Sequence, residues 1–366
     1  MTDSPLLSRP GAVAGGGPDA GVALHYGAPA HEQRALERGR GVVDLSHLGV
    51  ATVTGPDRLT WLNTLSTQLL LDLAPGQSGE LLLLDPNGRI EHAAAVVDDG
   101  ERTWLLTEAG HVAGLVEFLD RMRFMLRVVV EDVTERTAVL GSYGEAWRAV
   151  ADAPGHVITW QDPWPTTAPG GTTYGPPDAE HPGRDLHRAM SLVDRGRLAE
   201  VVDASGLRLA GTWAWEALRV EAWRPRLARE VDERAIPHEL DWLRTGVHLD
   251  KGCYRGQETV ARVFNLGRPP RRLVMLHLDG SEHITPEPGA RVLQGERDVG
   301  AVTSVVRHAE LGPVALALVK RSLPGDAQLT VDGIAAAQEV IVPVSGEAVG
   351  RPAERPGQEL RRRPRA

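Results

Sequence analysis

Residues 250–258 read Asp250-Lys251-Gly252-Cys253-Tyr254-Arg255-Gly256-Gln257-Glu258 and hold the single cysteine of the 366-residue chain. Glycine, cations, an aromatic ring and an amide are concentrated here beyond the needs of a plain hydrophobic core. The two glycines permit a tight turn and close backbone approach. Apolar residues follow with helical spacing at Val260, Val263 and Phe264. The segment therefore predicts a functional turn, with Cys253 just before the start of a helix.

Cys253 has the sequence surroundings of a reactive thiol. Lys251 and Arg255 flank it, and both cations and a helix N-terminus favour the thiolate, which is the nucleophilic and metal-binding form. The alternative is that Cys253 is a small buried hydrophobe. We predict the reactive form, with Cys253 and Lys251 as the catalytic residues.

The same segment resembles the Lys-Gly-Cys-aromatic-x-Gly-Gln-Glu signature of the YgfZ-type folate-binding proteins. These are relatives of the glycine-cleavage aminomethyltransferase (T-protein) and are implicated in maintaining iron–sulfur enzymes. Eight positions of mixed chemistry agree, which is far more specific than a lone glycine motif. Residues 41–49, 207–222 and 300–317 resemble further blocks of the T-protein family, in the family's order. The similarity spans most of residues 24–342.

The resemblance implies three domains around a central opening that holds tetrahydrofolate. It places Glu221 against the pterin edge, where a carboxylate can accept paired N–H bonds. His47 and Leu48 match the loop that approaches folate in the relatives. The alternatives are that Glu221 is a solvated helix residue and that His47 is structural.

The signature segment supplies the other candidate folate contacts, which are Tyr254, Arg255, Gly256 and Gln257. The ring of Tyr254 could stack or hydrogen-bond in the opening, because it is apolar with a polar tip. Packing of Tyr254 in the core is the alternative. No metal site is predicted.

One departure separates this chain from the active aminomethyltransferases. Those enzymes carry an aspartate pair just after a glycine-containing hairpin, whereas the matching stretch here, residues 88–94, reads Gly-Arg-Ile-Glu-His-Ala-Ala. Glu91 and His92 are the only nearby substitutes, and Ala93 occupies one matching position. We therefore do not expect the ordinary glycine-cleavage reaction.

The predicted function is that of a tetrahydrofolate-binding accessory factor for assembly or repair of iron–sulfur proteins, whose client or assembly proteins would be its partners. One thiol cannot hold a cluster alone, since known cluster sites use several cysteine ligands, so Cys253 is expected to act transiently or in a redox step. A folate-dependent aminomethyl or one-carbon transferase is the enzymatic alternative and would need a positioned acid or base. A folate-binding interaction module without chemistry is the third.

Composition narrows the class and the compartment. The formal net charge of −9 argues against a general nucleic-acid-binding protein. A single cysteine cannot form an intrachain disulfide, no signal-like segment opens the sequence, and no apolar run approaches the roughly 18 to 20 residues that span a bilayer. We expect a cytoplasmic protein that does not insert into membranes.

Periodicity and turn residues predict an α+β fold with a T-protein-like, three-domain architecture. Helices are expected at 30–38, from 57, at 112–122 and at 213–223. A hairpin is expected at 79–97 around its Asn-Gly turn, and short strands around 157–160. Six short β segments between 273 and 342 predict a small antiparallel barrel. The domains are predicted as a disordered tail (1–21), an aminomethyltransferase-like folate-binding region of two intertwined α+β subdomains (22–270), the barrel (271–345) and a disordered basic tail (346–366), with Arg361 to Arg365 at its end.

Overall fold

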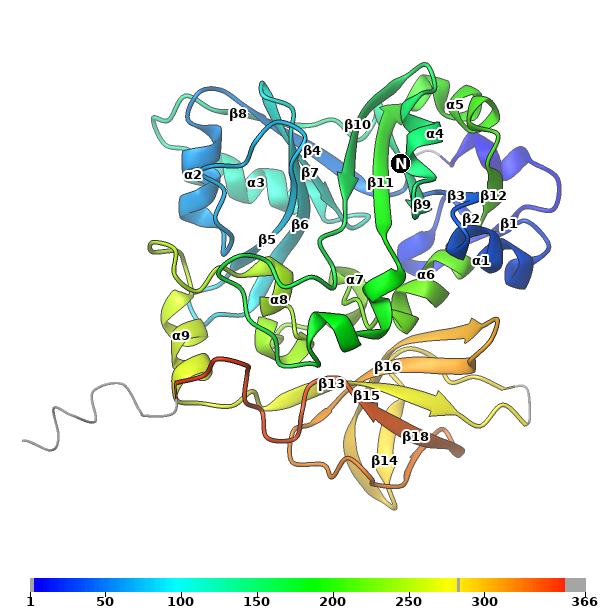
Figure 1. Cartoon of the computed structure of the whole chain (residues 1–366), viewed down its shortest axis with the longest axis vertical. Coiled ribbons are helices and arrows are strands. Elements are labelled where there is room, and N and C mark those ends of the chain that lie inside the picture. Colours follow the sequence, from blue (N-terminus) through cyan, green and yellow to red (C-terminus); the bar gives the residue numbers. More distant parts are fainter. Residues whose placement is uncertain (1–2, 282–283, 353–366) are drawn as a thin grey trace, which may run out of the picture.

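The computed structural model describes residues 3–281 and 284–352 and contains two five-stranded sheets and a closed six-stranded barrel (Figure 1). Helices pack on the sheets without a regular strand–helix–strand alternation. The predicted α+β class, with an antiparallel barrel at the C-terminal side, is confirmed. In the described ranges, no helix combines the length and apolar character needed to cross a membrane.

The first sheet is antiparallel and has the strand order β5-β6-β7-β4-β8. Helices α2 and α3 share its core, because α3 directs Val112, Leu115 and Leu119 to one side. The predicted hairpin is formed by β5 and β6, and Gly88 in its turn has a φ of +78°. The elements are β4 (Gly49–Thr54), α2 (Arg58–Leu65), β5 (Ser78–Leu84), β6 (Ile90–Asp98), β7 (Arg102–Thr107), α3 (Val112–Met122) and β8 (Val129–Asp132).

The second sheet has the order β10-β11-β9-β3-β12, with one parallel pair, β12 and β3. The chain enters this sheet at β3, builds the whole first sheet, and returns at β9. Periodicity had not indicated β11 or α5. The elements are α1 (Pro29–Glu37), β3 (Gly41–Asp44), β9 (Thr137–Tyr143), α4 (Trp147–Ala151), β10 (His156–Gln161), β11 (Arg188–Asp194), α5 (Leu198–Ser205), β12 (Arg208–Ala210) and α6 (Thr212–Glu221).

Short helices connect the second sheet to the barrel: α7 and α8 lie between the sheets and the barrel, and α9 lies at one edge of the molecule (Figure 1). Their apolar side chains join a core cluster that includes Leu82 of β5, Leu243 of the connection and Leu316 of the barrel. This shared core holds the three parts of the molecule together. The helices are α7 (Leu227–Glu230), α8 (Leu243–Gly246) and α9 (Gln257–Asn265), with a single turn at Pro237–Leu240. Two further turns, Asp178–Glu180 and Pro182–Asp185, lie in the loop between β10 and β11.

The barrel closes in the order β13-β16-β15-β14-β17-β18. Gly300 of β15 allows close strand contact, because a Cβ there would lie 2.3 Å from the carbonyl oxygen of Leu318. The last strand was expected at 339–342 but spans Ile334–Val340, because Asp332 and Gly333 form the preceding turn with positive φ. The strands are β13 (Arg271–Leu278), β14 (Arg291–Gln294), β15 (Arg297–His308), β16 (Gly312–Lys320), β17 (Leu329–Val331) and β18.

The N-terminal segment differs from the predicted disordered tail. Residues 3–21 fold against the second sheet, with a turn at Pro5–Ser8, β1 (Val13–Ala14) paired with β2 (Ala23–His25), and a turn at Gly17–Asp19. Leu6 is fully buried, and Ser4 donates a hydrogen bond to Asp44. A low apolar content misled the prediction, since this segment is held by one leucine and by polar contacts.

The predicted C-terminal tail also differs where it is described. Residues 346–352 lie against the loop before the second sheet's β11, because the Val349 N–H donates to Thr173 O at 2.8 Å and Thr172 Oγ1 donates to Val349 O at 2.6 Å. Ala348 joins the shared core. The basic stretch Arg361 to Arg365 lies outside the described residues.

Candidate functional site

A recess between the two sheets is the main candidate site. It encloses about 650 Å³, counting the part open to solvent. Its apolar walls include Leu48, Leu106 and Trp160, and the small side chains of Ala93 and Ala95 on β6 leave room beside them. Charged side chains reach it from several elements: Asp19, His47, Glu80, Glu108, Arg188, Arg224 and Arg226.

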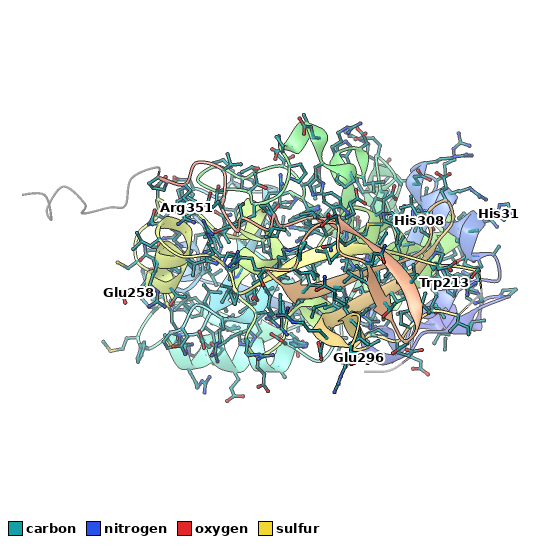
Figure 2. The ribbon with its side chains drawn as sticks, turned by 90° about the horizontal axis from the view of Figure 1, so that it is seen from below. His31, Trp213, Glu258, Glu296, His308 and Arg351 are labelled. Carbon is teal, nitrogen blue, oxygen red and sulfur yellow. The ribbon has the colours of Figure 1, made fainter. Side chains whose placement is uncertain are left out.

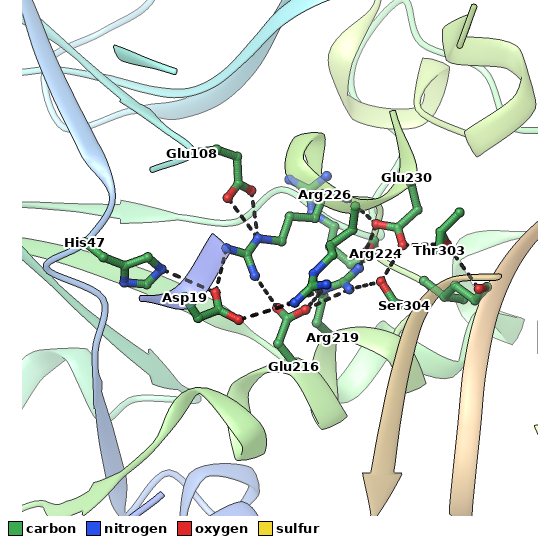
Figure 3. Close-up of polar contacts among 12 residues, drawn as sticks. Asp19, His47, Glu108, Glu216, Arg219, Arg224, Arg226, Glu230, Thr303 and Ser304 are labelled. Carbon is green, nitrogen blue, oxygen red and sulfur yellow. Dashed lines mark hydrogen bonds and ion pairs between the residues drawn. The ribbon is translucent and has the colours of Figure 1, made fainter. Parts of the chain in front are cut away.

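Arg226 is the centre of an ion-pair network on one side of the recess (Figure 3). Its Nε lies 2.9 Å from both oxygens of Glu108, its Nη2 lies 2.8 Å from Asp19, and its Nη1 lies 3.2 Å from Glu216. Burial alone would lower the pKa of Arg226, but the nearby carboxylates raise it well above its usual value. The network thus joins the N-terminal segment, the first sheet and helix α6 around one cation.

Arg219 extends this network to the barrel. It is 1% exposed, binds Glu216, and donates to Glu230 at 3.0 Å and to Ser304 of β15 at 2.6 Å. Thr303 donates to Glu230 at 2.8 Å. All three parts of the fold therefore meet at these charges (Figure 3).

A second charged cluster also borders the recess. Arg224 bonds Glu80 and donates to Asp162 at 3.1 Å. The Arg188 guanidinium stacks over the ring of Trp215, 4.3 Å from its centroid, and its Nε is 4.0 Å from Asp162. Burial lowers the pKa of Arg188.

Two predicted folate contacts line the recess. His47 and Leu48 lie in the turn between β3 and β4, and both are buried. His47 Nε2 is 3.4 Å from Asp19, so the imidazole also belongs to the ion-pair network. Burial opposes ionisation of Asp19, but His47 and Arg226 together hold the pKa of Asp19 well below its usual value.

Glu221, predicted to bind the pterin, does not line the recess. Its carboxylate lies 3.0 Å from His308 Nε2 at the end of β15. Glu216 is the carboxylate of α6 that faces the network, and a residue five positions later is turned by about 140° around a helix of 3.6 residues per turn. The pterin contact of Glu221 therefore stays a prediction, and the carboxylates that line the recess are Asp19, Glu80 and Glu108.

The signature segment also lies away from the recess. In the view of Figure 2, Glu258 at the start of α9 and His308 beside Glu221 are near opposite ends of the molecule. None of residues 251–258 lines the recess. The fold therefore does not place Arg255, Gly256 and Gln257 at the recess that His47 and Leu48 line.

Lys251 anchors this segment to the first sheet's domain. Its Nζ donates to the carbonyl oxygens of Ser66 and Gln68, each at 2.7 Å, and to that of Asn63. Burial lowers the pKa of Lys251 to about 8. All three N–H donors of the ammonium are thereby used. Lys251, a predicted catalytic residue, thus holds the loop in place.

Tyr254 and Gly256 fix the rest of the turn. Tyr254 is buried in the shared core, as the packing alternative expected. Gly256 has a φ of +83°, and a Cβ there would lie 2.6 Å from the carbonyl oxygen of Asp85 in the β5–β6 turn. Arg255 donates to Glu91 at 2.8 Å.

Cys253 is exposed between these anchors, four positions before the first residue of α9. Its thiol is thus displayed on the outer surface by a segment whose neighbours are buried or pinned. The substitutes for the aspartate pair are likewise outside the recess, since Glu91 bonds Arg255 and His92 packs on Phe118. Burial lowers the pKa of His92 to about 4, so its imidazole is neutral at pH 7.

Sequence reasoning missed most of the recess. Glu80 carried a usable signal, because a carboxylate in a run of leucines at a buried strand position needs a partner. The cations Arg224 and Arg226 directly follow α6 and flank Pro225, but no local pattern pairs them with Asp19 or Glu108.

Comparisons with known proteins agree with this architecture. The family model of the GCVT N-terminal domain matches residues 21–153. The chain is 30% identical over 329 residues to an aminomethyltransferase of Thermus thermophilus, covering 85% of this chain and 88% of that protein. It is 25% identical over 261 residues to an iron-sulfur cluster assembly factor IBA57 homolog of Cryptococcus neoformans, covering 65% of this chain and 66% of that protein.

Among solved structures, the glycine cleavage system aminomethyltransferase T of Bartonella henselae has the same fold. The TM-score is 0.72 at 20% identity, over 93% of this chain and 97% of that one.

Proposed function

Because this chain belongs to the aminomethyltransferase (GCVT) family, we propose that it is a tetrahydrofolate-binding accessory factor for the assembly or repair of iron–sulfur proteins. Two sites would share the work. The recess would hold the folate, and Cys253 would act on partner proteins at the surface.

The position of Cys253 carries this proposal. The thiol is exposed and lies outside the recess, while Lys251, Tyr254 and Gly256 hold its loop in place. A thiol that attacked the folate would have to face the recess. An outward thiol on a firmly held loop is instead suited to transient exchange with a second protein, and the likeness to an iron-sulfur cluster assembly factor homolog supports that role.

The recess suits a pterin. Leu48, Leu106 and Trp160 offer apolar surface to a flat ring, and Glu108 and Asp19 offer carboxylate oxygens to its N–H groups. Bound tetrahydrofolate would supply a carrier for one-carbon units. The chain's own residues would bind and orient it.

The enzymatic alternative is a folate-dependent aminomethyl or one-carbon transferase, which the 30% identity to an aminomethyltransferase favours. Such an enzyme needs an acid or base near the folate nitrogen. Glu91 and His92 lie outside the recess, and both oxygens of Glu108 accept from Arg226. These positions favour the accessory role.

The experiment that tests the proposal compares Cys253→Ser with the parent protein in cells that depend on it. We expect the activities of iron–sulfur enzymes to fall in the variant while its abundance stays unchanged. Purified parent protein should bind tetrahydrofolate and should not release ammonia from an aminomethylated lipoyl carrier. Efficient turnover in that assay would establish the transferase, and full support of iron–sulfur enzymes by Cys253→Ser would remove the thiol from the mechanism.

A further inference from the structure

Arg188 differs from the other cations of the recess because its guanidinium makes no hydrogen bond with the described residues. Its side chain is 15% exposed, its Nε has no hydrogen-bond partner, and its nearest carboxylate oxygen, on Asp162, is 4.0 Å away. That same oxygen accepts from Arg224 Nε at 3.1 Å. Asp162 is therefore already used by its closer partner.

The other cations at this site are well bonded. Arg226 binds Glu108, Asp19 and Glu216, and Arg224 binds Glu80 and Asp162. The Nε of Arg188 is buried without an acceptor, which is costly because its hydration is lost and no protein group replaces it. The charge of Arg188 thus contributes little to the stability of the folded protein.

The side chain is nevertheless held in one place. Arg188 begins β11, and the central carbon of its guanidinium lies over the ring of Trp215, 4.3 Å from the centroid, while both residues line the recess. Stacking fixes the plane of the group and leaves its edge as a set of donors. A rigid guanidinium of this kind suits two adjacent acceptor atoms lying in its own plane.

We infer that Arg188 anchors the ligand of the recess by donating two parallel hydrogen bonds to a pair of adjacent acceptor atoms on it. This rests on the proposed folate-binding function. A folate offers such a pair in two places. One is the 4-oxo oxygen with ring N5, which in oxidised folate matches the acceptor pair that arginine binds on guanine, whereas N5 of tetrahydrofolate is an amine with one N–H and one lone pair. The other is a carboxylate of the glutamate tail.

Local charge favours the ring edge. Around Arg188 lie the guanidinium of Arg224 and the carboxylates of Asp162, Glu80 and Glu216. Glu216 is paired with Arg219 and Arg226, which leaves Arg188 and Arg224 with Asp162 and Glu80. The cluster is balanced when these groups are ionised, so a neutral acceptor pair adds no net charge to the buried site. A carboxylate would leave the cluster with an excess negative charge.

Calorimetry on the full chain tests this inference with Arg188→Met, which keeps the stem and removes the donors, and Arg188→Lys, which keeps the charge and removes the fork. We expect tetrahydrofolate affinity to fall about tenfold or more in Arg188→Met and to be only partly restored in Arg188→Lys. Arg148→Met is the matched control, because Arg148 stacks on Trp147 at 4.7 Å at the surface, and it should bind like the parent.

Ligand-free stability separates an anchoring role from a structural one. Removing a cation that lacks hydrogen bonds should leave the melting temperature of Arg188→Met equal to or above that of the parent. A lower melting temperature together with parental affinity would overturn the inference and leave the proposed function standing. Absence of tetrahydrofolate binding to the parent would instead overturn the proposed function, and the anchor with it.

Two comparisons show which part of the ligand Arg188 binds: folic acid against aminopterin, and tetrahydrofolate against 6-methyltetrahydropterin. Folic acid and aminopterin differ only by the 4-oxo and 4-amino groups, so contact with the ring edge predicts weaker binding of aminopterin to the parent and no such difference in Arg188→Met. 6-Methyltetrahydropterin lacks the tail. If the tail carboxylate were the acceptor pair, Arg188→Met would bind this compound as well as the parent does. Either pattern supports the anchor, and equal loss of all ligands with a lower melting temperature would refute it.

Discussion

The ammonium nitrogen of Lys251 lies 2.7 Å from the carbonyl oxygen of Ser66 at the C-terminal end of α2. The last carbonyls of a helix have no partner within the helix, and a cation there is favourable. Lys251 therefore ties the loop that carries Cys253 to the domain of the first sheet.

Lys251→Met should destabilise the protein by about 1–3 kcal/mol, because three carbonyl groups lose a buried donor. Urea unfolding measures this. Lys320→Met is the control, since Lys320 Nζ donates to a single carbonyl, that of Asp298, at the surface, and it should change stability by less than about 0.5 kcal/mol. Equal effects of the two substitutions would show that the anchor contributes nothing special.

The two glycines of the signature segment should respond differently to alanine. Gly256→Ala should cost about 1–3 kcal/mol, because its φ is +83° and the new Cβ would meet Asp85. Gly252→Ala should be nearly neutral, since no atom lies within 4 Å of its Cβ position. Thermal unfolding of both variants checks the contrast, and a neutral Gly256→Ala would mean that the loop can move off the β5–β6 turn.

Cys253 should be fully alkylated by iodoacetamide in the native protein, as measured by mass spectrometry, because its side chain is exposed. Cys253→Ser should keep tetrahydrofolate affinity and change the free energy of unfolding by less than about 0.5 kcal/mol, as surface substitutions do. Resistance of the native thiol to alkylation would contradict the surface position.

The two carboxylates Glu221 and Glu108 should differ in folate binding. Glu221→Gln should bind tetrahydrofolate like the parent, because Glu221 contacts His308 and does not line the recess. Glu108→Gln should weaken binding about tenfold, as expected for the loss of a charged acceptor. Calorimetry with melting temperatures as a folding control decides this, and the opposite ranking would restore Glu221 as the pterin contact.

Acid should destabilise the protein through His238, which is fully buried and whose Nε2–H donates to Val260 O at 3.1 Å. Burial lowers the pKa of His238 to about 4 from its usual value of 6.5. The unfolded chain therefore takes up the proton first as pH falls, so stability is complete above pH 6.5 and is lost as pH falls toward 4. At pH 5 the loss from this one group is about 2 kcal/mol.

His238→Gln isolates that contribution. Urea unfolding of both proteins at pH 7 and pH 5 should show a smaller loss in the variant, while other titrating groups affect both alike. Identical losses would mean that His238 does not titrate with folding.

Local pattern was enough to predict much of the fold. Alternation and the Asn87-Gly88 turn gave the β5–β6 hairpin, and helical spacing gave α3. The barrel followed from short apolar segments separated by glycine and proline. Each of these features depends on residues close together in the chain.

The recess could not be predicted in that way. Asp19 and Glu108 come from segments far in sequence from α6 and its following loop, which carry Glu216 and Arg226, and their pairing is decided by tertiary contact. The same limit explains the N-terminal segment, which looked too polar to fold but supplies Asp19 to this network. For Glu221 the resemblance indicated the element, α6, but not that its side chain points to His308 and not into the recess.

The return of the chain from the first sheet to the second constrains how the protein can be cut and made. β3 pairs with β9, yet residues 49–132 build a complete sheet between them. A fragment that ends at residue 153, where the matched family domain ends, would contain β9 without β11, its partner on the other side. Such a fragment would present an unpaired edge strand, which is prone to aggregation.

During synthesis the second sheet likewise cannot be completed until about 160 further residues after β3 have emerged. Its assembly is therefore late and depends on non-local contacts.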